Sequence, residues 1–306
     1  MGVLVMSYGT PDDPDEIGAY YTHVRRGRAP SAEALADLRR RYMAIGGVSP
    51  LAERTRAQAD GIGAALERVQ PGRWKVFVGS KHAWPFIEDG VSAMVAANVR
   101  HGIGLVLAPH FSALSIGEYV DRVRDATEQA AISVRVIESW HLLPALVELL
   151  AERLTAALDS LPAELRDATE VLVTAHSLPA RVAEMGDPYP DQLRETAEAI
   201  TTAAGVTRWR LAWQSAGRTP EPWLGPDLSE VIRGLPAEGV RAVVVCPAGF
   251  TSDHLEVLYD IDIEALAVAE QAGVVLVRTE SLNDDPRLME ALAELVFEAE
   301  DRAPLP

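Results

Sequence analysis

The feature that most constrains the fold of this chain is the regular alternation of short apolar runs with longer helical patterns. Short runs rich in β-branched residues predict buried strands, and strands that alternate with helices are typical of βαβ units in a parallel sheet. Such runs predict strands at 3–7, 74–79, 104–108, 134–137, 171–175, 209–213, 242–246 and 274–278. Helical patterns lie between them, for example at 31–42, 52–69, 144–159, 191–203 and 285–298. We therefore expect an α/β protein.

The predicted strands fall into two similar sets of four. The segments LVMSYGT, VFVGSKH and LVLAPHF match LVTAHSL, LAWQSAG and VVCPAGF in the second half. We expect two similar Rossmann-like, doubly wound domains, each with a four-stranded parallel sheet, arising by duplication or as two unrelated parallel halves. The N-terminal domain is predicted at 1–143 and the C-terminal domain at 144–306, with a last helix that can pack back on the first domain. Ligands of such folds bind beyond the carboxyl ends of the strands.

The charge balance excludes one class of partner. The chain has 28 Lys and Arg against 45 Asp and Glu, a formal charge of −17, which repels nucleic acid and anionic lipid surfaces. Arginines nevertheless cluster near the N-terminus, which predicts either a local anion site or a solvated helix face. These arginines are Arg25, Arg26, Arg28, Arg39, Arg40 and Arg41.

Cysteine usage and apolar runs indicate the compartment. Cys246 is the single cysteine, so the chain forms no internal disulfide and holds no iron-sulfur cluster through several cysteines of its own. The start MGVLVMSYGT lacks the features of a signal peptide, and no apolar run approaches the roughly 18 residues of a membrane span. We expect a cytoplasmic protein that is neither secreted nor membrane-spanning.

Carboxylates recur in the segment DHLEVLYDIDIE. Glu256, Asp260 and Glu264 stand at i, i+4 and i+8, which places them on one face of a helix. Like charges at this spacing repel, so a row of oxygen ligands for a divalent cation would explain them. An exposed acidic face on an acidic protein is the alternative.

Two side chains stand at equivalent strand ends in the two halves. Tyr8 follows the first predicted strand, and His176, in the motif AHSLP, follows the fifth. A histidine at such a position can be a polar cap or a buried structural group. Together with a carboxylate helix, however, it would form a mixed nitrogen and oxygen site of the kind that suits ferrous iron. An imidazole with an ordinary pKa of about 6.5 would be a neutral proton acceptor there.

The chain resembles a known family over nearly its whole length. The resemblance is to ferrochelatases, and specifically to the coproporphyrin ferrochelatases of Gram-positive bacteria. The motifs that carry it are MSYGTP, YYTHVRRGR, YMAIGGVSPL, KHAWPFIEDGV, LAPHFS, AHSLP, MGDPYPDQL, WQSAGRTPEPWLGPD and GFTSDHLEVLYDID.

The resemblance implies a chelatase-like fold and a lyase that inserts Fe(II) into coproporphyrin III in haem biosynthesis. It implies that His176 and Glu256 bind iron and accept protons on one face of the porphyrin, and that Tyr8 lies on the opposite face. Asp260 and Glu264 would form an outer metal site. Propionate or pocket-rim contacts are implied for Arg25, Arg41, Tyr42, Ser49 and Tyr119, and Trp84, Trp213 and Trp223 are candidate wall residues.

The resemblance also sets expectations for cofactors and partners. We expect iron as a substrate, no permanently bound cofactor, and no [2Fe-2S] cluster, because the cysteines that hold one in some relatives are missing. The segment PDDPDEIGAYY is too charged for stable membrane insertion, and a monomer is expected. Protoporphyrin enzymes commonly have methionine where Tyr8 stands, which favours coproporphyrin.

Three alternatives remain open at this point. A protoporphyrin ferrochelatase would share the motifs, a cobalt or nickel chelatase would share the fold, and a non-catalytic tetrapyrrole carrier would share the cleft. The pairing of His176 with Glu256 favours an enzyme over a carrier, because a carrier needs neither a proton acceptor nor a carboxylate that delivers metal.

Overall fold

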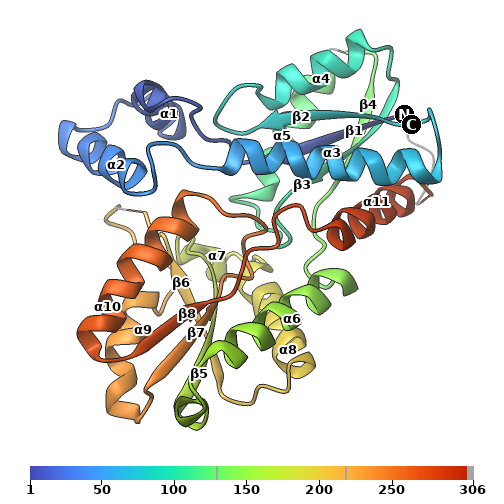
Figure 1. Cartoon of the computed structure of the whole chain (residues 1–306). Coiled ribbons are helices and arrows are strands. Elements are labelled where there is room, and N and C mark those ends of the chain that lie inside the picture. Colours follow the sequence, from blue (N-terminus) through green and yellow to red (C-terminus); the bar gives the residue numbers. More distant parts are fainter. Residues whose placement is uncertain (129, 218, 302–306) are drawn as a thin grey trace.

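A computed structural model gives the fold of the chain and describes residues 1–128, 130–217 and 219–301. Its strands form two four-stranded sheets in which every pair of neighbours is parallel (Figure 1). The strands are β1 (Gly2–Ser7), β2 (Lys75–Ser80), β3 (His101–Val106), β4 (Ser133–Ile137), β5 (Thr169–His176), β6 (Trp209–Gln214), β7 (Ala242–Cys246) and β8 (Val275–Arg278). The predicted α/β fold with two Rossmann-like sheets is confirmed.

The two sheets have the same strand order. The first runs β2-β1-β3-β4 and the second β6-β5-β7-β8. Within each half the first strand therefore lies inside the sheet, between the second and the third. The chain leaves such a strand toward one side and returns on the other, and ligands of such folds bind beyond the carboxyl end of a strand in this position. Tyr8 directly follows this strand in the first half, and His176 ends the equivalent strand in the second.

The third strand lies earlier than expected. It covers His101–Val106 rather than 104–108. Gly102 and Gly104 interrupt its apolar pattern, so the sequence obscures where the strand begins. A Cβ atom at Gly102 would overlap Cε of Met94, so helix α4 (Ile87–Ala96) can pack this closely on the strand only because the residue is glycine.

Helices cover both faces of the sheets (Figure 1). They are α1 (Ile17–Val24), α2 (Ala32–Ala44), α3 (Leu51–Val69), α4 (Ile87–Ala96), α5 (Ile116–Glu128), α6 (Pro144–Ser160), α7 (Arg181–Glu184), α8 (Tyr189–Ala203), α9 (Leu228–Gly234), α10 (Leu266–Ala272) and α11 (Pro286–Asp301). Short 3₁₀ helices cover Pro14–Glu16, Ala163–Ala168 and Leu235–Glu238, and a π-helix, Val257–Ala265, runs directly into α10.

One buried apolar cluster joins the two halves. It contains Val3 and Val5 of β1 together with Val171 and Val173 of β5, and helices α3, α6, α8 and α11 contribute to it. Each half also has a buried cluster of its own, around Leu4 and Met6 in the first half and around Leu172 and Val243 in the second. Removal of apolar side chains from water is the main force that stabilises a fold, so the shared cluster makes the two halves stabilise each other.

The last helix returns to the first half. Figure 1 shows α11 beside α3 and close to α6. Met289 of α11 packs against Gly61 of α3, and the pair Arg68–Glu290, at 2.6 Å, links the same two helices. A domain boundary between residues 143 and 144 stays a prediction, supported by the start of α6 at Pro144. The last five residues of the predicted C-terminal domain, 302–306, lie outside the described part.

Within the described ranges, none of the helices is both long enough and apolar enough to cross a membrane.

Candidate active site

The two side chains at the centre of the candidate site meet beyond the second sheet. His176 ends β5, and Glu256 directly precedes the π-helix that follows β7. His176 Nε2 lies 3.5 Å from Glu256 Oε1, and each side chain keeps about a third of its surface exposed, at 34% and 33%. The structure thus brings this imidazole and this carboxylate together at a position that solvent and ligands can reach.

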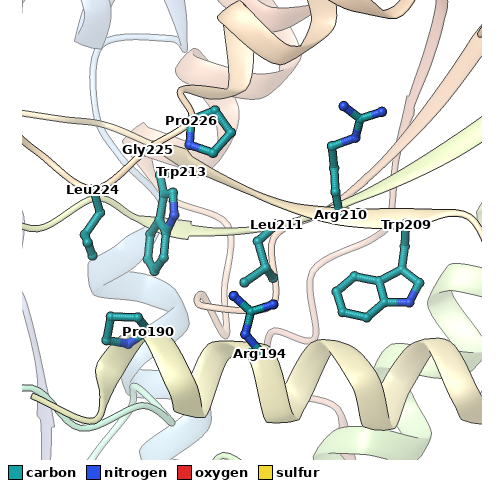
Figure 2. A pocket seen from close by; sticks show the side chains of 9 residues that line it. All are labelled: Pro190, Arg194, Trp209, Arg210, Leu211, Trp213, Leu224, Gly225 and Pro226. Atoms are coloured by element: carbon teal, nitrogen blue, oxygen red, sulfur yellow. The ribbon is translucent and has the colours of Figure 1, made fainter. Parts of the chain in front are cut away.

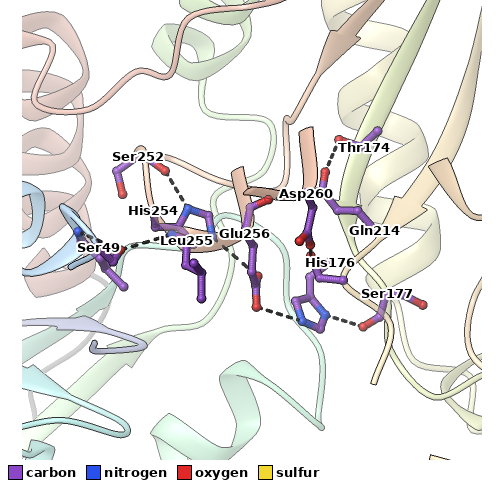
Figure 3. A network of polar contacts seen from close by, with 12 residues as sticks. Ser49, Thr174, His176, Ser177, Gln214, Ser252, His254, Leu255, Glu256 and Asp260 are labelled. Carbon is purple, nitrogen blue, oxygen red and sulfur yellow. Dashed lines mark hydrogen bonds and ion pairs between the residues drawn. The ribbon is translucent and has the colours of Figure 1, made fainter. Parts of the chain in front are cut away.

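Glu256 has a second imidazole neighbour. His254 Nε2 lies 3.6 Å from Glu256 Oε2, while His254 Nδ1 is 2.9 Å from the carbonyl oxygen of Ser252. Figure 3 shows the Glu256 carboxylate between the two imidazole rings. The carboxylate is therefore held from both sides.

The electrostatics of the pair differ from the expected neutral imidazole. Burial lowers the pKa of His176, but the attraction of the Glu256 carboxylate, with hydrogen bonds to Glu256 and to the Ser177 carbonyl, outweighs burial and raises this pKa to about 9. Burial alone would raise the pKa of Glu256, but His176 and His254 lower it well below its ordinary value. Both shifts favour an imidazolium and carboxylate pair at neutral pH.

The helix that carries the carboxylates is not an ordinary α-helix. Val257–Ala265 forms a π-helix, in which the backbone bonds reach five residues rather than four. The i, i+4, i+8 spacing keeps side chains roughly on one face in either geometry, so the sequence pattern does not distinguish them. π-Helical turns occur frequently at functional sites.

Asp260 lies one turn beyond Glu256, and both of its carboxylate oxygens have partners within the protein. Its Oδ1 is 3.2 Å from Arg41 Nη1, and its Oδ2 accepts a hydrogen bond from the Ser215 hydroxyl. Burial, followed by the charge of Glu256, raises the pKa of Asp260 to about 6 despite these partners. Glu264 lies at the surface. In the part of the chain that the structure describes, His, Cys, Asp and Glu side chains form no group of three or more that could hold a metal ion.

The first half presents a different set of groups at the equivalent strand end. Tyr8 is 42% exposed, and its ring lies 4.6 Å from that of His82. Lys81 is buried with its Nζ 5.9 Å from the Tyr8 ring and 2.5 Å from Glu118 Oε2. This end therefore combines an exposed phenol with a buried ammonium group.

The arginines expected at the rim occupy two different settings. Arg25 is exposed, and its guanidinium lies 5.7 Å from the Tyr21 ring. Arg41 pairs with Asp37 and Asp260 and lies 4.9 Å from the Tyr259 ring. Arg25 is thus open to an anionic ligand, whereas Arg41 links α2 to the π-helix.

Three residues expected at the pocket rim are buried. The Tyr42 hydroxyl bonds Thr10 at 3.0 Å, and Ser49 Oγ accepts a bond from the Leu255 backbone at 3.2 Å. The Tyr119 ring packs against Lys81, and its centroid is 5.4 Å from Lys81 Nζ. These side chains support the walls of the site, and their direct contact with a ligand stays a prediction.

A groove of about 440 Å³ lies outside this constellation, between β6 and α8. Figure 2 shows Trp209, Leu211 and Trp213 pointing toward α8, while Arg210 points the other way. Successive strand residues face opposite sides, so Trp213 lies on the face of the sheet opposite to its neighbour Gln214, which contacts Glu256. Trp213 therefore lines this groove and not the site of His176 and Glu256, whereas Trp84 is 73% exposed.

Sequence patterns did not assign a role to several residues of the site. His254 stands two residues before Glu256 in the DHLE segment, which predicts an imidazole near the carboxylate but not the contact between them. Lys81 and His82 follow β2, a strand end to which no function was assigned. Gln214 ends β6 beside His176, and only the pairing register of the strands reveals this.

Comparison with known proteins identifies a family for the chain. The sequence profile of the ferrochelatase family matches residues 1–300. A coproporphyrin III ferrochelatase of Anoxybacillus flavithermus is 45% identical over 300 residues, which cover 97% of this chain and 95% of the relative. The coproporphyrin III ferrochelatase of Bacillus subtilis is 43% identical over 300 residues, which cover 97% of each.

Solved structures support the fold alone. The sirohydrochlorin chelatase SirB from Bacillus subtilis subspecies spizizenii, in complex with cobalt, matches with a TM-score of 0.56 at 14% identity, covering 98% of this chain and 95% of that one. CbiX, a terminal enzyme of sirohaem biosynthesis in denitrifying bacteria, matches with a TM-score of 0.55 at 16% identity, covering 98% and 99%. Because the family profile and the curated relatives cover nearly the whole chain, this protein belongs to the ferrochelatase family.

Proposed function

We propose that this chain inserts Fe(II) into coproporphyrin III, releases two pyrrole protons and so forms the iron complex in haem synthesis. Family membership and the named activity of the relatives support the reaction. The observation that carries the proposal is the 3.5 Å contact between His176 Nε2 and Glu256 Oε1, on groups that remain partly exposed. A mixed nitrogen and oxygen pair of this kind suits ferrous iron.

Glu256 and His176 have different roles in this proposal. Glu256 is the anionic group to which a divalent cation is drawn first, and His176 then offers its imidazole nitrogen on the same side. Iron that approaches Glu256 weakens the attraction that keeps His176 protonated, so the pKa of His176 falls and the imidazolium releases its proton to solvent, which reaches its exposed surface. The neutral imidazole that results accepts the two pyrrole protons one after the other as the metal enters the ring, and passes each to solvent.

Positively charged side chains near Tyr8 can bind the anionic groups of the substrate. Arg25 and Arg28 are exposed beside α1, and Lys81, which pairs with Glu118, lies buried next to Tyr8. Guanidinium groups hold carboxylates well, often through two parallel hydrogen bonds. We propose that these cations attract the four propionates of coproporphyrin, and that Tyr8 faces the ring on the side opposite to His176.

Besides the named activity of the relatives, Tyr8 and the entry segment support coproporphyrin over protoporphyrin. Asp12, Asp13, Asp15 and Glu16 are all exposed there. Such a rim gains nothing from a lipid surface, where the apolar protoporphyrin would be delivered, and it suits a substrate that arrives through water. Outer metal binding by Asp260 and Glu264 stays a proposal with less support, because Asp260 already pairs with Arg41.

The test is an anaerobic insertion assay with Fe(II) on coproporphyrin III and on protoporphyrin IX at equal concentration. We expect faster turnover of coproporphyrin III, and faster turnover of protoporphyrin IX would contradict the substrate assignment. Repeating the assay with Co(II) and Ni(II) separates this reaction from that of a cobalt or nickel chelatase. Binding of coproporphyrin without insertion of any of these metals would instead identify a carrier.

A further inference from the structure

Gln214 contacts the backbone on both sides of the site, next to His176 and at Glu256. It lies at the end of β6, directly beside His176 in the register of the parallel strands. The backbone carbonyl oxygen of Gln214 accepts a 2.7 Å hydrogen bond from the backbone N–H of Ser177. Its side chain extends the other way, and its amide nitrogen lies 3.3 Å from the carbonyl oxygen of Glu256. One residue thus contacts the backbone next to each reacting group.

The orientation of the Gln214 amide is determined by its neighbours. A backbone carbonyl only accepts hydrogen bonds, so the side-chain nitrogen must face Glu256 and the oxygen must face away. That oxygen accepts a 2.8 Å hydrogen bond from the hydroxyl of Thr174, which lies two residues before His176 on β5. Thr174 is fully buried and Gln214 is 2% exposed, so water does not compete for these bonds. Figure 3 shows Thr174 and Gln214 next to each other, on the side of His176 where Asp260 lies.

The carbonyl that Gln214 contacts lies at a special point of the backbone. Glu256 is the residue directly before the π-helix Val257–Ala265. At this point the hydrogen-bond period of the helix changes from four residues to five, and the direction of the Glu256 side chain depends on where the change occurs. A carbonyl oxygen has two lone pairs, so the Gln214 bond adds to any bond within the helix and fixes this carbonyl from outside.

We propose that Gln214, held by Thr174, is a positioning residue that keeps Glu256 at the correct distance and angle from His176. Gln214 touches neither the carboxylate nor the imidazole, so its effect is indirect. The inference rests on the proposed iron insertion by this pair. It predicts that loss of the amide slows insertion without weakening porphyrin binding.

The first experiment compares Gln214→Leu with wild type in the anaerobic Fe(II) insertion assay. Because a single hydrogen bond of this kind contributes modestly, we expect kcat to fall about 10-fold, while KM for coproporphyrin III stays within about twofold. The matched control is Gln70→Leu. Gln70 also forms one side-chain hydrogen bond, to Trp74 at 3.0 Å, but it lies before β2 at the opposite end of the first sheet. Its kcat should match that of wild type.

The second experiment separates positioning from general packing. Thr174→Val removes the hydroxyl at nearly constant shape and should lower kcat about threefold, whereas Thr174→Ser restores the hydroxyl and should recover most of it. In the Gln214→Leu background, Thr174→Val should have almost no further effect, because Thr174 acts through the amide that is already missing. Independent, multiplying effects of the two substitutions would contradict the proposal, as would an unchanged kcat in Gln214→Leu.

Failure of the proposed function would be visible separately. A wild-type chain that binds coproporphyrin III but inserts no iron would overturn that function and leave the positioning to be judged by structure. Crystal structures of wild type and Gln214→Leu would then decide. A longer distance between His176 Nε2 and Glu256 Oε1 in the variant is expected, and an unchanged distance would overturn the inference. If Gln214→Leu does not fold, the comparison of Thr174→Val with Thr174→Ser decides by the same two measurements.

Discussion

The carboxyl ends of β1 and β5 occupy the same place in two sheets of the same strand order, but they present opposite chemistry. At the end of β1, Tyr8 lies next to His82 and Lys81. At the end of β5, His176 lies next to Glu256. The first end combines a phenol with a buried positive charge, and the second combines an imidazole with a carboxylate.

The difference is clearest in two imidazoles. Burial, followed by the charges of Lys81 and His23, lowers the pKa of His82 to about 3. At the other end, Glu256 outweighs burial and raises the pKa of His176 to about 9. A repeated fold therefore gives one end that is suited to an anionic macrocycle and one that is suited to a metal cation and to protons.

The largest effect is expected from Glu256→Gln, which removes the anion at the second end with almost no change in shape. Iron then lacks its first attachment, and the pKa of His176 loses the support that raises it. We expect Fe(II) insertion to fall by at least about 100-fold while coproporphyrin III still binds. Steady-state insertion and a fluorescence-quenching titration measure the two quantities.

Glu270→Gln is the control for Glu256→Gln, because it makes the same change on the exposed surface of α10. Its insertion rate should equal that of wild type. An insertion rate for Glu256→Gln within about tenfold of wild type would show that the second end is not the metal side.

A smaller effect is expected when the positive charge of the first end is removed. Lys81→Met should raise KM for coproporphyrin III about 10-fold and change kcat little, because attraction of the propionates is lost but the metal side is intact. Lys75→Met is the control, since Lys75 lies at the start of the same strand and is exposed. A fall in kcat with constant KM would place Lys81 in the chemical step instead.

The pH dependence of stability should have opposite signs at the two ends. His176 has a raised pKa in the folded state, so its contribution is complete below about pH 6.5 and is lost as pH rises through about 9. His82 has a lowered pKa, so its contribution is present above about pH 6.5 and is lost as pH falls toward about 3. Melting temperatures of wild type, His176→Asn and His82→Asn between pH 4 and 9 measure both, and differences with the same sign would contradict the comparison.

The smallest effect is expected from Tyr8→Phe. The hydroxyl of this exposed ring is proposed to face the macrocycle opposite to His176, where it contacts the iron of the product rather than the entering metal. We expect an insertion rate within about threefold of wild type, together with a shifted absorption band of the bound product. An unchanged product spectrum would show that the Tyr8 hydroxyl does not contact the iron of the product.

The sequence predicted the fold well because strand and helix periods are local properties. Only β3 was misplaced by several residues, since Gly102 and Gly104 obscure its apolar pattern while allowing close packing of Met94. The π-helix was not predicted, because the spacing of Glu256, Asp260 and Glu264 fits α- and π-geometry alike.

The site was predictable where the chemistry resides in motif residues and not where it depends on packing. His176 and Glu256 were named from strand ends and spacing, and the structure places them in contact. The pairing of Arg41 with Asp260 and the contact of Ser49 with Leu255 depend on how α2 and the segment before the π-helix meet. The burial of Tyr119 depends on the packing of α5 in the core of the first half. A contact between segments 219 residues apart leaves no periodic signal in the sequence.

The most direct measurement is single-turnover insertion by His176→Ala. The enzyme is loaded with coproporphyrin III, mixed anaerobically with Fe(II), and followed by the absorbance of the free-base and metallated rings. With the imidazole missing and the first end intact, the variant should bind the porphyrin with an affinity within about threefold of wild type and metallate it at least about 100-fold more slowly. Near-normal metallation would show that the imidazole at the end of β5 takes no part in iron insertion.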